Sequence, residues 1–294
     1  MATATGNYPS DNSTLANFKS WAMAISSAFG ALGWLQTSDT GQVNWSSIGS
    51  VPSNNYVYEV WKANDAQAAT LPIFLRIEYG YSSSAPRCRV YAGTGSNGSG
   101  TLTGGLLTGA PWEVTYEGSN HGGAGYPCFF SGDAGEFRFY LWQGLTSNSS
   151  CVLAVERSKD SSGNKTTEYF TVLCANAYTG TANTFQQTIV SPSLVGNREN
   201  GVVCLSLTSG SGTGLWNGTV AALPVFPILG KVGNPMLGMM AAVASDTLDG
   251  ALVSVVSLYG ASHNFVVANR GNFANCLGTR TNGSIALAIL LRYE

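Results

Sequence analysis

The sequence predicts a mainly β protein, with one or more antiparallel β-sandwich or barrel-like domains and a single N-terminal helix. Near the N-terminus, apolar residues recur at alternating intervals of three and four, as on one face of a helix. From about residue 55 they alternate with polar residues, which is the period of a strand. Many of the 36 glycines lie between the alternating segments and mark turns. Regular alternation of strands with helices is missing, so a parallel α/β sheet is not expected.

The helix is predicted within residues 13–33, where Ser13 is placed to cap the first turn and Gly33 to end the last one. Its apolar stripe consists of Leu15, Phe18, Ala22, Ile25, Phe29 and Leu32. A helix of this length is not stable alone in water, so the stripe must pack on another surface. We expect a neighbouring subunit to supply that surface, in a trimer for preference, with the chain's own β domain as the alternative.

The predicted strands are short and rich in aromatic and β-branched residues. The polar turn 159–164 predicts a hairpin over 151–175. Other strands are predicted at 73–79, 112–116, 137–142, 202–207, 252–259, 265–268 and 285–292. Residues 223–243 are apolar and rich in Pro, Gly and Met, and a buried loop or a subunit contact fits them as well as a helix does.

Three regions are expected along the chain. Residues 1–50 form an arm and the helix, of which the first twelve residues are extended or mobile. Residues 51–177 form a first β domain and residues 178–294 a second, with one continuous β domain as the alternative.

The low charge is the unusual feature of the composition. Only 10% of the residues are charged, against about 25% in an average globular protein. A monomer normally stays soluble through a mixed, charged surface. Either neutral polar groups cover this chain, or partner subunits bury much of it. The net charge of −2, without a basic block, argues against a nucleic-acid partner.

No stretch reaches the length of a membrane span, and the first residues lack the charged and apolar regions of a signal peptide. We therefore expect no membrane insertion and synthesis in a cytoplasm. The six cysteines lack metal-ligand spacing and are expected to be free thiols. No disulfide is expected.

The sequence predicts no catalytic residue, metal site or cofactor site. The glycine-rich loops 93–98 and 210–214 lack the spacing or the lysine of nucleotide-binding loops. Of the two histidines, His121 is expected in a flexible turn and His263 at an edge or on the surface.

Carboxylate pairs and stacked aromatic residues are two further functional possibilities. The carboxylates that could form a glycosidase pair are Glu113, Glu117, Asp133 and Glu136. The Cα atoms of Glu113 and Glu117 would be about 13 Å apart on one strand, which favours two solvated residues. The seven tryptophans and thirteen tyrosines could stack on sugars or fill a core, and the sequence leaves both open.

Three segments resemble a known class of protein. They are Tyr58-Glu-Val-Trp-Lys-Ala-Asn-Asp65, Leu71-Pro-Ile-Phe-Leu-Arg-Ile-Glu-Tyr-Gly80 and Val90-Tyr-Ala-Gly-Thr-Gly-Ser-Asn-Gly-Ser-Gly-Thr-Leu-Thr-Gly104. Their succession, over about a third of the chain, resembles virion structural proteins of tailed bacteriophages, of the tail, baseplate or fibre-associated type. The resemblance includes no catalytic signature and no functional residues.

The resemblance implies a non-enzymatic virion component that is assembled in the host cytoplasm into a symmetric homo-oligomer, together with other virion proteins. Low charge, abundant small polar residues and many strands agree with this function. Two alternatives remain open: a capsid decoration protein, and a carbohydrate-binding β module that recognises a host-surface glycan.

Overall fold

The computed structural model describes residues 2–8, 14–82, 85–104, 112–113, 126–142, 150–177, 184–190, 195–199, 202–204, 215–216, 219–220, 222–229, 232–233, 236–243, 252–256, 262–268 and 287–292. Within them the chain is mainly β, with antiparallel sheets and one helix, α1 (Leu15–Ala31), near the N-terminus. The predicted fold class is therefore confirmed. The sheets are open rather than closed into a barrel, because each ends in two edge strands among the residues described.

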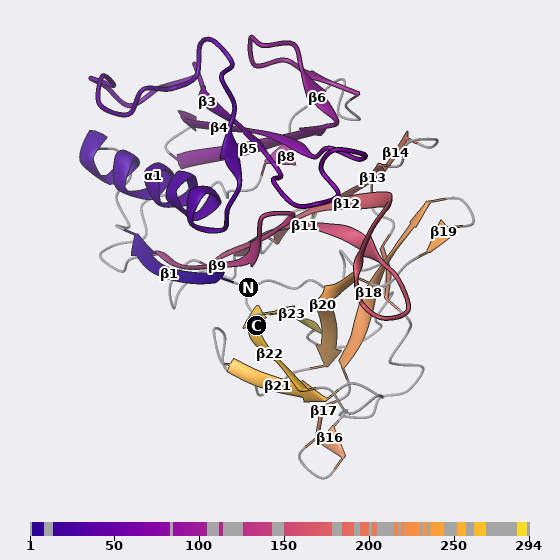
Figure 1. The fold of residues 1–294 in the computed structure, drawn as a ribbon. Coiled ribbons are helices and arrows are strands. Elements are labelled where there is room, and N and C mark those ends of the chain that lie inside the picture. The colour runs from indigo at the N-terminus through magenta and orange to yellow at the C-terminus, as the bar shows by residue number, and fades with distance from the viewer. Residues whose placement is uncertain are drawn as a thin grey trace.

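Three larger sheets build the molecule (Figure 1). The small sheet contains, in spatial order, β2 (Leu35–Gln36), β3 (Val57–Lys62), β4 (Phe74–Ser82), β5 (Ala85–Gly93) and β8 (Trp112–Glu113). The central sheet contains β1 (Ala2–Tyr8), β9 (Tyr126–Asp133), β10 (Glu136–Trp142), β11 (Ser150–Lys159), β12 (Lys165–Ala177), β13 (Thr184–Val190) and β14 (Val195–Glu199).

The C-terminal sheet runs β15 (Val202–Cys204), β18 (Ala222–Leu229), β20 (Met236–Val243), β23 (Leu287–Arg292), β22 (Ser262–Ala268) and β21 (Leu252–Val256), and β19 (Val232–Gly233) pairs with β18. Two small ribbons pair β6 (Gly95–Ser96) with β7 (Leu102–Thr103) and β16 (Leu215–Trp216) with β17 (Thr219–Val220). In Figure 1, α1 and the small sheet lie on one side of the central sheet, and the C-terminal sheet lies on the other.

The helix begins one residue later than expected, because Thr14 rather than Ser13 is its N-cap. The Thr14 hydroxyl accepts the backbone N–H of Asn17 at 3.2 Å, which satisfies one of the free donors of the first turn. The last helical residue is Ala31, and Gly33 terminates the helix as predicted. Gly33 has a φ of +90°, and the N–H of Trp34 donates to the Phe29 carbonyl, which together form a Schellman motif.

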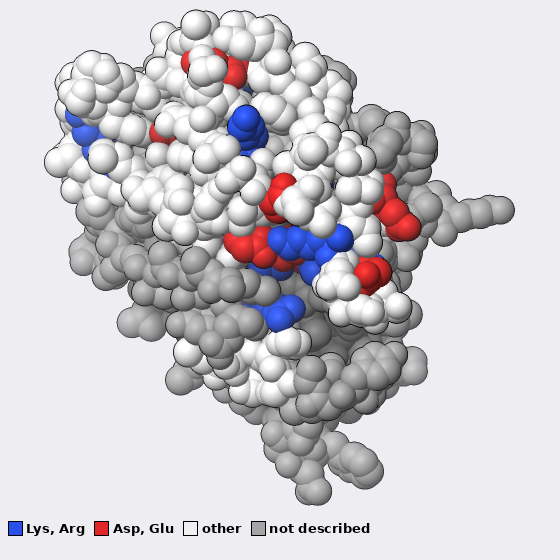
Figure 2. Space-filling view, in the orientation of Figure 1, with Lys and Arg blue, Asp and Glu red and all other residues white. Residues whose placement is uncertain are grey.

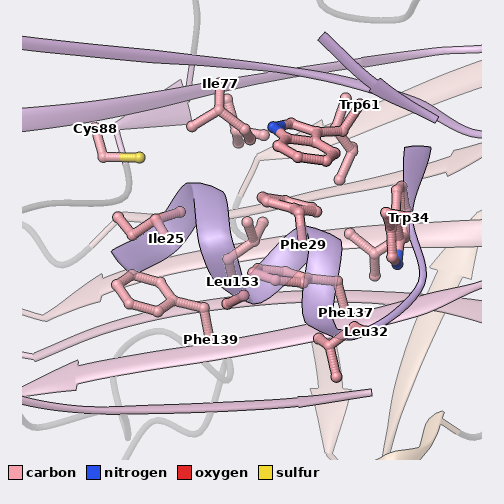
Figure 3. Close-up of a cluster of buried hydrophobic side chains, with 14 of the residues drawn as sticks. Ile25, Phe29, Leu32, Trp34, Trp61, Ile77, Cys88, Phe137, Phe139 and Leu153 are labelled. Carbon is pink, nitrogen blue, oxygen red and sulfur yellow. The ribbon is translucent and has the colours of Figure 1, made fainter. Parts of the chain in front are cut away.

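The hydrophobic core lies on both sides of α1 (Figure 3). Ile77 and Trp61 of the small sheet approach the helix from one side, and Phe137 of the central sheet approaches from the other. Phe29 stacks on Phe137 with ring centroids 3.9 Å apart and on Trp61 at 5.3 Å. This stack of three rings joins both sheets through the helix.

The structure confirms one predicted hairpin and assigns strands to segments that had no predicted secondary structure. The hairpin predicted over 151–175 is confirmed by β11 and β12. Residues 223–243, which fitted no pattern, largely form β18 and β20. The expected arm contributes β1, which pairs with β9 along its whole length. One hydrophobic cluster contains buried residues between Phe18 and Val172, so side chains from both sides of the expected boundary at residue 50 share a core.

Candidate functional site

Four charged side chains form a closed network on the face of the central sheet opposite α1. Nη2 of Arg138 lies 2.6 Å from Oε2 of Glu136 and 3.4 Å from Oε2 of Glu156. Nζ of Lys159 lies 2.8 Å from Oε1 of Glu136 and also pairs with Oε1 of Glu156. The β11–β12 register is irregular between Arg157 and Lys159, and this irregularity turns the lysine side chain toward this face. Two carboxylates and two cations thus neutralise one another; we call these four residues the quartet.

Three members of the quartet are buried, and Lys159 is partly exposed. Arg138 is fully buried, and Glu136 is 1% exposed. Burial alone would raise the pKa of Glu136, but the charges of Arg138 and Lys159 outweigh it and lower the pKa to about 2. Burial disfavours the charged guanidinium of Arg138, yet Glu136 and Glu156 raise its pKa. A general acid or base needs a pKa near the working pH, which Glu136 does not have.

The C-terminal sheet meets the central sheet beside the quartet. The Ser131 hydroxyl of β9 donates to the Arg292 carbonyl of β23 at 2.7 Å. Nη2 of Arg292 lies 3.0 Å from Nδ1 of His263, and because a guanidinium only donates, this ring nitrogen must accept and carry no proton. Burial and the nearby Arg138 lower the pKa of Arg292. Burial and Arg292 lower the pKa of His263.

A further ion pair joins the loop between β3 and β4 to the central sheet. Nε and Nη2 of Arg157 donate to the two carboxylate oxygens of Asp65 at 2.6 and 2.8 Å, and Nη1 donates to the Leu71 carbonyl at 2.7 Å. This forked geometry fixes direction as well as distance. A Cβ at position 135 would collide with the Asp65 carboxylate, so Gly135 allows the approach.

Glu59 is the centre of a third group of buried polar side chains, and its carboxylate accepts hydrogen bonds from neutral donors in four parts of the chain. Oε1 accepts the Ser26 hydroxyl and the Trp45 indole N–H, both at 2.8 Å. Oε2 accepts the Trp61 indole N–H at 3.2 Å and the Tyr79 hydroxyl at 3.1 Å. Glu59 is 1% exposed. One carboxylate therefore fastens α1, the following loop, β3 and β4 together.

Partly exposed aromatic rings lie on the face of the small sheet away from α1, where a sugar would have to stack. The Arg76 guanidinium lies 4.1 Å from the centre of the Tyr58 ring, and that of Arg89 lies 3.9 Å from the centre of the Tyr56 ring. The backbone of Gly100 lies against the Tyr58 ring. Both rings are therefore already stacked from within the chain. Among the side chains that the structure describes, every Trp and Tyr is buried or only partly exposed.

The predicted assembly residues lie in the chain's own core. Five of the six stripe residues are buried, and Leu15 is partly exposed; the five are Phe18, Ala22, Ile25, Phe29 and Leu32. They pack on the small and central sheets, which is the alternative that the sequence left open. A neighbouring subunit would have to open the core to reach them.

Of the carboxylates considered for catalysis, Asp133 and Glu136 stand opposite each other in the β9–β10 register, and each is paired with a cation. The backbone of Glu113 pairs with Arg89 in the small sheet. Asp133 pairs with Lys165, and Glu136 belongs to the quartet. Glu117, like His121, lies outside the described residues. His263 is partly buried against Arg292 rather than free at an edge.

Of the cysteines, Cys88 is buried in the core, and the thiols of the others are outside the described part of the chain. Within that part, no group of histidine, cysteine and carboxylate side chains could hold a metal ion. No described helix is long and apolar enough to cross a membrane.

The burial of Glu59 and Arg157 could have been predicted from their positions in the sequence. Glu59 stands at the same strand phase as Val57 and Trp61, and Arg157 at the phase of Leu153 and Val155. A charge in phase with apolar residues must be buried with them if the strand is regular. The partners came from distant segments and could not be identified in the same way.

No protein-family model and no curated protein matches the chain.

Proposed function

We propose that the chain is a non-enzymatic structural protein of a repeated assembly, and specifically a component of the tail, baseplate or fibre region of a tailed-phage virion. The observation that carries this proposal is how little charge reaches the surface. The chain has 16 acidic and 14 basic residues. Among those whose side chains the structure describes, six are buried: Glu59, Glu78, Glu136, Arg138, Glu156 and Arg157. The composition is already poor in charge, and the fold uses part of that charge internally.

The described surface is correspondingly neutral. Between residues 14 and 58 the only charged side chains are Lys19 and Asp39. Figure 2 shows broad white areas over the upper part of the molecule, with charged side chains gathered in a band across the middle. A free monomer with this surface lacks the charge that keeps proteins apart in solution. Copies of the chain, or other virion proteins, are the partners that such a surface suits.

The buried polar groups support a structural role rather than catalysis. The quartet is charge-balanced, and Glu59 accepts four hydrogen bonds from neutral donors. Such closed sets stabilise one arrangement of the layers, and the low pKa of Glu136 leaves it without a proton to transfer near neutral pH.

The virion assignment adds the resemblance to this physical argument. The three resembling segments contribute β3, most of β4, the end of β5 and the β6–β7 ribbon. They therefore belong to one layer of the molecule, the small sheet with its adjoining ribbon. Glycan binding by this sheet is less favoured, because Arg76 and Arg89 already stack on its aromatic rings.

Particle association tests the proposal. An epitope-tagged copy, supplied in infected host cells, is expected to sediment with complete particles and to resist a high-salt wash. An antibody to the tag should decorate one defined region of the particle in electron micrographs. Recovery of the tagged protein only in the unassembled fraction would contradict the proposal.

A further inference from the structure

The edge strands of the three larger sheets differ in how well they are protected. Edges offer unpaired backbone groups to other chains, and proteins block them with short strands, charges or bulges. On the small sheet both edges, β2 and β8, have two residues each. On the C-terminal sheet β15 has three residues, and on the central sheet β14 ends in Arg198 and Glu199. These four edges are blocked in one of the usual ways.

Strand β21 has none of these devices. Its five residues, Leu252–Val256, contain no charge and no proline, and they pair with β22 without a register shift. Among the strands described, its other side pairs with nothing, and Figure 1 shows it outermost on the C-terminal sheet. Leu252 is 61% exposed, more than Met23 and Leu35, which are the other exposed large apolar side chains among those described. The remaining edge, β1, is also uncharged, and it packs against α1.

We propose that β21 is a subunit contact, at which it pairs antiparallel with β21 of a second copy of this chain. The strand is nearly palindromic about Ser254. A two-fold axis through Ser254 sets Leu252 opposite Val256 of the partner subunit and Val253 opposite the partner's Val255. Apolar residues thus meet apolar residues, and the two serines face each other. No charge on the strand would select a different partner.

This contact deepens the proposed function and rests on it. It extends the C-terminal sheet of one copy into that of the next, which is an isologous contact with the same residues on both sides. It joins copies in pairs, so it predicts a dimer or an assembly built from dimers. It differs in this from the trimer expected through the helix stripe.

Charge reversal at the axis tests the contact. Ser254→Lys places two ammonium groups face to face, and Ser254→Glu places two carboxylates there. Each variant alone is expected to weaken dimerisation at least tenfold in sedimentation equilibrium. An equal mixture of the two should recover dimers of mixed composition, because the opposite charges then meet. Ser27→Lys, at an exposed helix position, is the matched control and should dimerise like the unmodified chain.

Amide hydrogen exchange separates failure of the contact from failure of the proposed function. In the unmodified oligomer, outward amides of 252–256 should be protected, and Ser254→Lys should expose them while the rest of the C-terminal sheet is unchanged. An oligomer that keeps its mass in both charged variants would overturn the β21 contact and leave particle association standing. A chain that is monomeric at all concentrations would also overturn it.

Discussion

At the scale of single residues, Glu59 has an unusual environment. A buried carboxylate commonly faces a cation, but the four hydrogen bonds to Glu59 all come from neutral groups, with Ser26 and Trp45 on one oxygen and Trp61 and Tyr79 on the other. Burial, together with the nearby Glu59, raises the pKa of Tyr79 well above its ordinary value, so this phenol remains a donor. The arrangement requires an acceptor at both oxygens.

Glu59→Gln is therefore expected to destabilise the protein although it keeps the shape of the side chain. The amide has one acceptor oxygen, so its NH₂ group would face two donors. The expected loss is about 1–3 kcal/mol. Urea unfolding followed by tryptophan fluorescence measures it. Glu168→Gln, at an exposed position, should leave the midpoint where it is; an equal midpoint for Glu59→Gln would show that the four hydrogen bonds do not require a carboxylate.

His263 gives the stability a dependence on pH. Its Nδ1 must be unprotonated to accept from Arg292, and its pKa in the folded state lies below the ordinary value of 6.5. Above that value neither state binds the proton, and the contribution is fully present. As the pH falls below it, the unfolded chain binds the proton first, so stability is lost.

His263→Asn should flatten this dependence, because the Asn oxygen accepts a hydrogen bond without titrating. We expect the unmodified chain to lose more stability than the variant between about pH 7 and pH 5. Denaturant unfolding at several pH values, compared between the two proteins, provides the measurement. Parallel curves would mean that His263 does not titrate differently in the folded state.

At the scale of elements, α1 is a structural layer rather than an appendage. Its apolar stripe packs on two sheets, and the stack of Trp61, Phe29 and Phe137 crosses it from one sheet to the other. The opposite face of the helix is exposed and includes Met23, which is 42% exposed. The two faces therefore predict different effects of substitution.

Phe29→Ala is expected to cost about 3–5 kcal/mol, because it removes the middle ring and leaves a cavity between two sheets. Met23→Ala on the opposite face should change stability by at most about 0.5 kcal/mol. Thermal unfolding of both variants by circular dichroism tests this contrast. Similar melting temperatures for the two would contradict the buried position of Phe29.

Local sequence patterns predicted the helix and several strands, but they could not predict which distant segments pair or pack together. The helix, the strand at 137–142 and the hairpin over 151–175 follow from periodicity and turn residues close in sequence. The pairing of β1 with β9 joins segments more than 100 residues apart, and no periodicity encodes it. The same limit applies to the apolar stripe of α1. Its residues indicate that it packs on another surface, but the sequence could not decide between a neighbouring subunit and the chain's own sheets.

At the scale of the whole molecule, the central sheet is covered on both faces, and each covering layer is joined to it by buried polar groups. Asp65 and Arg157 join the loop between β3 and β4 to it, and Ser131 and Arg292 join the C-terminal sheet beside the quartet. Removing one member of a buried, balanced set leaves an unpaired charge inside the protein, which is costly.

Arg138→Met is accordingly expected to destabilise the fold by about 3–5 kcal/mol, since Glu136 and Glu156 would lose one of their two shared cations and share only Lys159. Lys165→Met, which removes the more exposed pair with Asp133, should cost at most about 1 kcal/mol. Guanidinium unfolding compares the two variants. Comparable losses would indicate that the quartet contributes no more than a surface ion pair.

The pairing of β1 with β9 also has a consequence for synthesis on the ribosome. At ordinary elongation rates, the more than 100 residues between these strands take roughly 10 s to translate. During that interval the nascent chain exposes the stripe of α1, and the small sheet, complete as far as Gly93 except for β8, is the first surface that can cover it. The other side of the helix waits for the central sheet. Folding is therefore expected to proceed in two steps, with a half-covered helix as the aggregation-prone intermediate that chaperones would bind.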